Sequence, residues 1–125
     1  MTEAVKVLVV GVGNMGLSHA LAYHAIPGFD LVGLMSRTIR RRRDLPMALA
    51  DVRRFEDFDQ ALEETKPEAV SINTWPDTHA DYALRALDAG CHIFMEKPIA
   101  TSVADAEKIV RKAQETKRKL VIGYI

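Results

Sequence analysis

A glycine-rich segment, Gly11-Val12-Gly13-Asn14-Met15-Gly16, has the residue types and the spacing needed to hold a diphosphate. It follows an apolar run, residues 5–10, that has the composition of a buried strand, and it opens a helical pattern that ends before Pro27. In such a loop the first glycine permits a tight turn, the second lets the backbone approach a pyrophosphate, and the third lets the helix pack closely on the strand. The N–H groups at the start of the helix, among them those of Asn14 and Met15, would face the phosphates. The segment predicts a dinucleotide site; the alternative is a strand-to-helix turn that simply favours glycine.

The residues that would choose between NAD(H) and NADP(H) follow the second apolar run, residues 29–35. An NAD site usually has an acidic residue about 20 positions beyond the glycines, where it binds the ribose 2′-hydroxyl. Here that place is taken by Ser36, Arg37 and Thr38, whose hydroxyl and guanidinium groups suit a 2′-phosphate. We therefore predict NADP(H) as the preferred cofactor, with NAD(H) also possible. The basic run at 40–43 is either a further source of positive charge or a solvated helix face.

Apolar runs alternate with helical patterns along the whole chain, and this alternation predicts the fold. Strands are expected over residues 5–10, 29–35, 52–55, 69–73, 91–95 and 120–124. Helices are expected after the glycine loop, over 38–50 with a break near Pro46, after Asp57, over 77–89 with a stop at Gly90, and after Ser102 with Val103, Ala106, Ile109, Val110 and Ala113 facing inward. The pattern predicts an α/β fold, a Rossmann-type doubly wound parallel sheet in the order 3-2-1-4-5-6 with helices on both faces, in three αβα layers. The ligand crevice would lie between strands one and four, where the loop from Asn73 should face the glycine loop.

The composition narrows the classes of partner. Lys and Arg together number 17, and so do Asp and Glu, so no net charge attracts the chain to nucleic acid or to an anionic membrane. No apolar stretch approaches the ~20 residues of a membrane span, and the first residues lack the basic region of a signal peptide. Cys91, the single cysteine, is expected to be buried and inert, and it fits a reducing, cytoplasmic location. We predict no metal site.

Two further segments, Thr74-Trp75-Pro76-Asp77-Thr78-His79 and Gly90-Cys91-His92-Ile93-Phe94-Met95-Glu96-Lys97-Pro98, make the sequence similar to a known family. Together with the glycine loop they resemble the Gfo/Idh/MocA oxidoreductases, and the resemblance covers all 125 residues. It implies a nucleotide-binding domain that works with a larger α+β domain. Such proteins use NAD(P) to oxidise or reduce sugar-like or polyol-like alcohols and carbonyls, and they commonly form homo-oligomers.

The resemblance also implies roles for individual residues. Thr74, Trp75, Pro76 and His79 would line the cofactor, although Trp75 departs from the small residue or proline usual there and His79 could instead only hydrogen-bond the start of its own helix. Lys97 would be the catalytic residue that orients substrate and assists proton transfer, with Glu96 balancing its charge and Pro98 fixing the loop through a cis peptide. The alternative for Glu96 and Lys97 is an exposed ion pair in a turn.

Nothing in residues 1–125 is expected to form a substrate domain. The sequence therefore predicts the NAD(P)-binding domain of an oxidoreductase, which would bind cofactor but show little turnover when isolated. The alternative is a non-catalytic module that binds or senses NAD(P), or that supplies a subunit interface. The uncovered apolar surface of the last strand predicts self-association.

Overall fold

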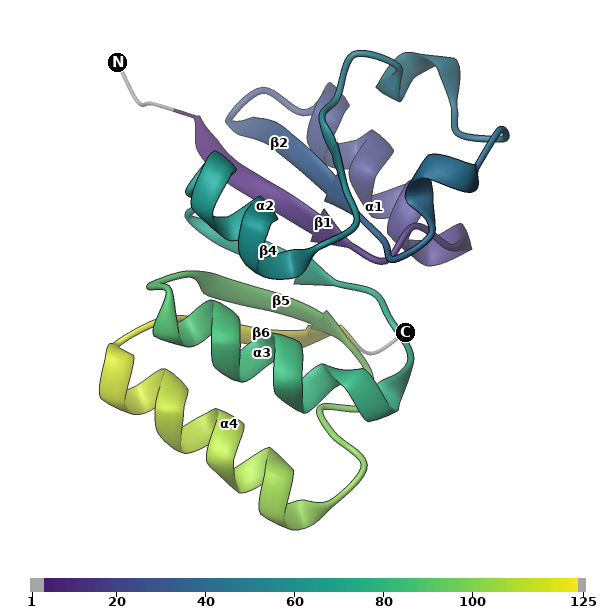
Figure 1. The fold of residues 1–125 in the computed structure, drawn as a ribbon. Coiled ribbons are helices and arrows are strands. Elements are labelled where there is room, and N and C mark those ends of the chain that lie inside the picture. Colours follow the sequence, from purple (N-terminus) through teal and green to yellow (C-terminus); the bar gives the residue numbers. More distant parts are fainter. Residues whose placement is uncertain (1–3, 124–125) are drawn as a thin grey trace.

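The computed structural model describes residues 4–123, which form one parallel sheet with helices on both faces (Figure 1). The strands are β1 (Val5–Val10), β2 (Phe29–Met35), β3 (Arg54–Phe55), β4 (Ala69–Ile72), β5 (His92–Glu96) and β6 (Leu120–Gly123). The α-helices are α1 (Asn14–Ala25), α2 (Phe58–Thr65), α3 (His79–Asp88) and α4 (Val103–Thr116). Short 3₁₀ helices span Ile39–Arg41, Met47–Leu49 and Pro76–Thr78.

The strand order is β3-β2-β1-β4-β5-β6, and every neighbouring pair is parallel. The predicted order 3-2-1-4-5-6 is thereby confirmed. The chain leaves β1 toward β2 on one side and later returns to place β4 on the other side of β1. The loops that follow β1 and β4 therefore diverge at the carboxyl edge of the sheet, which is where this class of fold binds its ligands.

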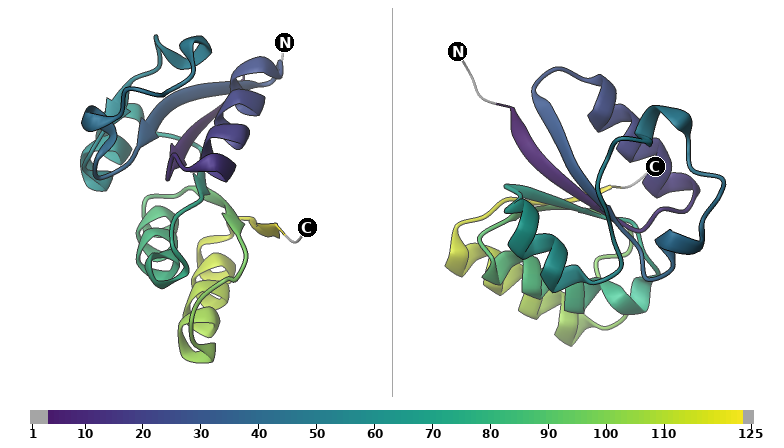
Figure 2. Two further views of the ribbon diagram at one scale, coloured as in Figure 1. Left: turned by 90° about the vertical axis from the view of Figure 1, so that its right-hand side faces the viewer. Right: turned by 45° about the horizontal axis from the view of Figure 1, so that its top comes forward.

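The two faces of the sheet bury two separate apolar clusters, as expected for a parallel sheet. One cluster lies under α2, α3 and α4 and includes Leu8, Ile72 and Met95. The other lies under α1 and the first two 3₁₀ helices and includes Val9 and Leu34. Figure 2 shows α1, in purple-blue, on the opposite side of the sheet from α3, in green, and α4, in yellow-green. The three predicted layers are present.

The predicted helix caps are confirmed. The Asp57 carboxylate accepts a hydrogen bond from the Gln60 N–H at 2.8 Å, and the Ser102 hydroxyl accepts one from the Asp105 N–H at 3.1 Å. Gly90 follows α3 with a φ of +85°, a conformation that favours glycine at a helix end. These local signals fix where α2, α3 and α4 begin or end.

The prediction of a helix over 38–50 is wrong. The chain there makes two separate 3₁₀ turns, Ile39–Arg41 and Met47–Leu49, with irregular backbone between them. Pro46 has no N–H to continue a helix and disfavours helical backbone at the residue before it. Two apolar anchors, Ile39 and Leu49, are fully buried and hold the segment against the sheet without a regular helix.

The inward face predicted for α4 is only partly correct. Ile109 and Ala113 are buried, but the side chains of Val103 and Val110 are 75% and 41% exposed. Because α4 packs mainly on α3, only a narrow stripe of it is covered. Regular structure is also shorter than predicted around β3, and Tyr124, placed in the last strand, lies outside the described residues. Among residues 4–123, no helix combines the length and apolarity needed to cross a membrane.

Candidate cofactor site

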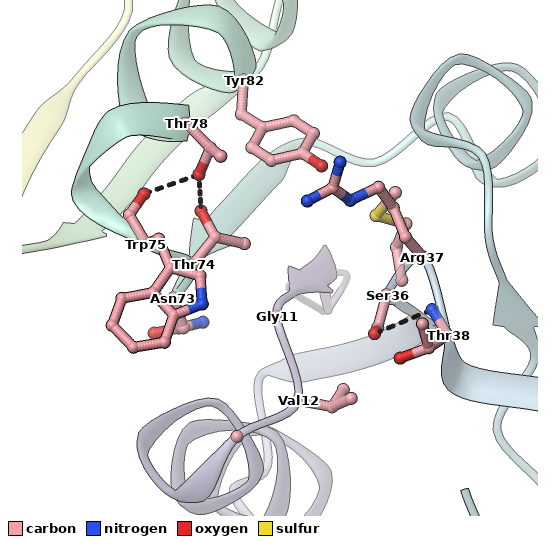
Figure 3. A pocket seen from close by; sticks show the side chains of 12 residues that line it. Gly11, Val12, Ser36, Arg37, Thr38, Asn73, Thr74, Trp75, Thr78 and Tyr82 are labelled. Carbon is pink, nitrogen blue, oxygen red and sulfur yellow. Dashed lines mark hydrogen bonds between the residues drawn. The ribbon is translucent and has the colours of Figure 1, made fainter. Parts of the chain in front are cut away.

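A cleft of about 490 Å³ opens at the carboxyl edge of the sheet, between the loops that follow β1, β2 and β4 (Figure 3). Its lining residues are Gly11, Val12, Gly13, Met35, Ser36, Arg37, Thr38, Asn73, Thr74, Trp75, Thr78 and Tyr82. The structure therefore brings three sequence-predicted segments together: the glycine loop, the tip of β2 and the loop after β4. Asn14, Met15 and Gly16 belong to the helix start beside this cleft and are not among its lining residues.

The glycine loop packs so tightly that two of its glycines are required by the fold itself. Gly11 has a φ of +90°, and a Cβ on it would lie 2.5 Å from the carbonyl oxygen of Asn73. A Cβ on Gly16 would lie 1.9 Å from the carbonyl oxygen of Gly11. These contacts join the loop after β1 to both α1 and the loop after β4.

Gly13 differs from the other two glycines. It is the N-cap of α1, it lines the cleft, and a Cβ built on it meets no atom within 4 Å. No side chain caps the first turn of this helix, so its N–H groups and the positive end of the helix dipole are available to an anion. Packing of the described residues does not require glycine here, whereas close approach of a phosphate does.

The tip of β2 presents hydroxyl and guanidinium groups to the cleft. The Ser36 hydroxyl accepts a hydrogen bond from the Thr38 N–H at 3.4 Å, which closes a small turn at the end of the strand. The Arg37 side chain is exposed, and Figure 3 shows its guanidinium pointing toward the hydroxyl of Tyr82 on α3. No carboxylate is among the lining residues.

The loop after β4 forms the opposite wall. The hydroxyls of Thr74 and Thr78 are 2.5 Å apart, and the Thr78 hydroxyl donates to the carbonyl oxygen of Trp75 at 2.7 Å. This network holds the loop in place while the Trp75 side chain stays 80% exposed at the rim. Thr78 and Tyr82 were not predicted as site residues. Thr78 and Tyr82 are four residues apart at the start of the predicted helix, so they share one helix face, and this spacing is the signal that would have found them.

Asn73 carries an unsatisfied acceptor in the cleft wall. Its side-chain N–H group donates to the backbone oxygen and the hydroxyl of Ser71, both at 3.1 Å, but its buried Oδ1 has no partner among the described residues. A buried acceptor without a donor costs stability. The orphaned oxygen fits a ligand hydroxyl or N–H donor, and the space over Gly13 fits a phosphate.

His79 is fully buried and does not line the cleft. Its Nδ1 lies 2.7 Å from the carbonyl oxygen of Pro98, and its Nε2 lies 3.1 Å from the carbonyl oxygen of Thr74. The imidazole thus links the loop after β4 to the loop after β5. Pro76, at the start of the 3₁₀ turn before α3, also lies outside the lining.

The loop after β5 lies at the same edge of the sheet but outside the cleft. The Lys97–Pro98 peptide is cis, an isomer that the sequence left open, and the Lys97 side chain is exposed. Glu96 was expected to balance the charge of Lys97. Its carboxylate instead lies 2.7 Å from Nε2 of His19 on α1. The two residues are 77 positions apart, so sequence spacing could not reveal this contact.

Of the basic run at 40–43, Arg42 is the member that reaches the site. Its guanidinium donates to the carbonyl oxygen of Val12 at 2.9 Å and to both carboxylate oxygens of Asp44, at 2.6 and 3.1 Å. The hydrogen bond from Arg42 lowers the pKa of Asp44. Arg40 and Arg41, the residues expected to add positive charge, are exposed and outside the lining. Among residues 4–123, no group of three or more His, Cys, Asp or Glu side chains is arranged to hold a metal ion.

A doubly wound parallel sheet with a glycine loop at its switch point is a nucleotide-binding domain of the Rossmann type. The model of one family, described as oxidoreductase family, NAD-binding Rossmann fold, matches residues 5–124. The chain belongs to this family, Gfo/Idh/MocA, as the sequence resemblance implied.

Several relatives are similar over nearly the whole chain. UDP-N-acetylglucosamine 3-dehydrogenase of Acidithiobacillus ferrooxidans is 36% identical over 117 residues, which are 94% of this chain and 36% of that protein. The structure of scyllo-inositol dehydrogenase from Lactobacillus casei with bound NAD(H) and scyllo-inositol is 28% identical, with a TM-score of 0.85 over 97% of this chain and 36% of that one. The structure of GenD2 from gentamicin A biosynthesis in complex with NAD is 32% identical, with a TM-score of 0.89 over 98% of this chain and 35% of that one. The chain thus spans little more than a third of the length of these relatives.

Proposed function

We propose that this domain binds NADP(H) in the cleft, in preference to NAD(H), and serves an oxidoreductase that acts on an alcohol or carbonyl group of a sugar-like or polyol-like substrate. The family and the named relatives support the dinucleotide and the substrate class. The observation that carries the cofactor preference is the tip of β2, where Ser36 and Arg37 line the same cleft as the glycine loop. A cytoplasmic location and a homo-oligomeric state stay predictions.

Each wall of the cleft has a separate task in this proposal. Gly13 and the start of α1 would hold the pyrophosphate, with Gly11 and Gly16 keeping the loop in the required shape. Ser36, Arg37 and Thr38 would hold the phosphorylated ribose at the other end. Tyr82, mostly buried beside Arg37, would add a hydroxyl and an aromatic edge to that end.

The reacting end would lie toward the loops after β4 and β5. A bound nicotinamide cofactor supplies hydride transfer. Lys97, exposed on the loop after β5, would exchange a proton with the substrate oxygen, and an ammonium group can both donate the proton and orient that oxygen. His79 would act indirectly, since its two ring nitrogens contact the backbone of the loops that flank this end.

The preference for the 2′-phosphate is tested by the variant Ser36→Asp. A carboxylate at the end of β2 would repel a 2′-phosphate and accept a hydrogen bond from an unphosphorylated ribose. We expect NADPH affinity to fall at least tenfold, about 1.4 kcal/mol, while NADH affinity is kept or rises. Both affinities are measured by calorimetry.

Ser102→Asp is the matched control, because it makes the same chemical change at the N-cap of α4, where aspartate also caps. It should leave both affinities unchanged. If Ser36→Asp weakens the binding of NADPH and of NADH equally, or weakens the binding of neither, the proposed role of the β2 tip is wrong.

A further inference from the structure

Arg42 makes three hydrogen bonds, one to the glycine loop and two to Asp44 within its own irregular surface segment. One of its nitrogens donates to the carbonyl oxygen of Val12 at 2.9 Å, and the opposite side of the guanidinium forms a two-pronged contact with the carboxylate of Asp44. The Arg42 side chain is 28% exposed, whereas Arg40, Arg41 and Arg43 are exposed. Arg42 is therefore held in place at both ends of its planar group.

The contact with Val12 fixes the direction of a peptide group that borders the cleft. In a trans peptide the carbonyl of Val12 and the N–H of Gly13 point in opposite directions. A carbonyl turned toward Arg42 thus turns the Gly13 N–H to the other side. This N–H makes no hydrogen bond with another described residue, and Gly13 itself lines the cleft.

We propose that Arg42 is a positioning residue that orients the Val12–Gly13 peptide, so that the Gly13 N–H is directed to the pyrophosphate before the cofactor arrives. This inference rests on the proposed function, because it assumes a dinucleotide in the cleft. Orientation set before binding raises affinity by reducing the ordering that binding requires. Asp44 neutralises most of the local charge of the guanidinium, so the contribution of Arg42 is orientation rather than long-range attraction.

The variants Arg42→Ala and Asp44→Ala together distinguish orientation of the peptide from charge attraction of the cofactor. Arg43→Ala is the control, because it removes the same charge as Arg42→Ala. By calorimetry we expect Arg42→Ala to weaken NADPH binding about tenfold, the scale of one charge-assisted hydrogen bond. Asp44→Ala should also weaken binding, because the guanidinium loses the group that holds it. Attraction alone would make Asp44→Ala bind NADPH more tightly, since a negative charge is removed. That result, or an unchanged affinity in Arg42→Ala, overturns the proposal.

Amide NMR of the ligand-free variants provides a readout that does not depend on cofactor binding. Arg42→Ala should shift the amide resonances of Gly13 and Asn14, while Arg43→Ala leaves them in place. If the wild-type chain binds neither NADPH nor NADH, the proposed function fails, and the spectra still decide whether Arg42 sets the loop. Unchanged Gly13 and Asn14 resonances in Arg42→Ala would refute the positioning role.

Discussion

Replacing Gly13 by alanine should weaken cofactor binding strongly while leaving the fold intact. Gly13 has a φ of −73° and a ψ of −168°, which any L-residue adopts, and its added Cβ would meet no atom within 4 Å. Alanine is a poorer N-cap than glycine by roughly 0.5–1 kcal/mol. Alanine also restricts the unfolded chain, which returns about 0.4–1 kcal/mol. The two effects nearly cancel, so the melting temperature should change by no more than about 3 °C.

The same methyl group occupies the space where a phosphate would approach the backbone. It would hold the phosphate away from the N–H groups at the start of α1, and we expect at least a hundredfold loss of NADPH affinity, about 2.7 kcal/mol. Calorimetry gives the affinity, and thermal unfolding of the same sample gives the stability. An NADPH affinity within threefold of the wild type would refute the assignment of this loop as the pyrophosphate site.

Gly16→Ala is the opposite case and serves as the comparison. Inside a helix this change ordinarily stabilises by about 1 kcal/mol. Here the Cβ would lie 1.9 Å from the carbonyl oxygen of Gly11. Because this oxygen is a backbone atom, the loop or the helix itself must move to relieve the clash. Overpacking of this kind costs roughly 1–3 kcal/mol or more. The variant should melt at a clearly lower temperature, and a stabilised Gly16→Ala would contradict the close packing of α1 on the loop.

Two further predictions concern the thiol and the lysine. Burial raises the pKa of Cys91 to about 11, so between pH 9 and 11 the folded chain keeps a proton that the unfolded chain has released, and stability falls as pH rises. Urea unfolding should show a loss of roughly 2–3 kcal/mol over this range that is absent in Cys91→Ala; an equal loss in that variant would assign it to other groups. Lys97→Met should weaken NADPH binding several-fold but leave 2′,5′-ADP, which lacks the nicotinamide end, unaffected, whereas Lys108→Met on α4 should change neither affinity. An equal loss of affinity for NADPH and for 2′,5′-ADP would mean that Lys97 contacts the adenosine end or that the substitution disturbs the fold.

Signals local in sequence predicted the fold well. The strand order, the facing of the glycine loop and the Asn73 loop, and the caps at Asp57 and Ser102 are all confirmed. Each depends on residue types at short fixed spacings. The alternation of strands and helices then leaves few ways to assemble a parallel sheet.

Features that depend on long-range packing were missed. The helix expected over 38–50 is replaced by two 3₁₀ turns, because Ile39 and Leu49 anchor the segment and Pro46 interrupts it. With no helix there, Arg42 can bend toward Val12, 30 residues earlier, a contact that helical spacing does not reveal.

The pairing of Glu96 with His19, 77 residues apart, and the double contact of His79 were hidden for the same reason. Each joins segments that are distant in sequence and that the sheet order brings to one edge. Sequence analysis singled out Glu96 and His79 but not His19, and it could not determine the partners of either.

The most direct test of the account is a calorimetric titration of the wild-type chain with NADPH and with NADH in the same buffer. We predict binding of both, with NADPH tighter by at least tenfold, about 1.4 kcal/mol. Equal affinities, or tighter binding of NADH, would contradict the role of Ser36 and Arg37. Absence of binding by either dinucleotide would contradict the assignment of the cleft itself.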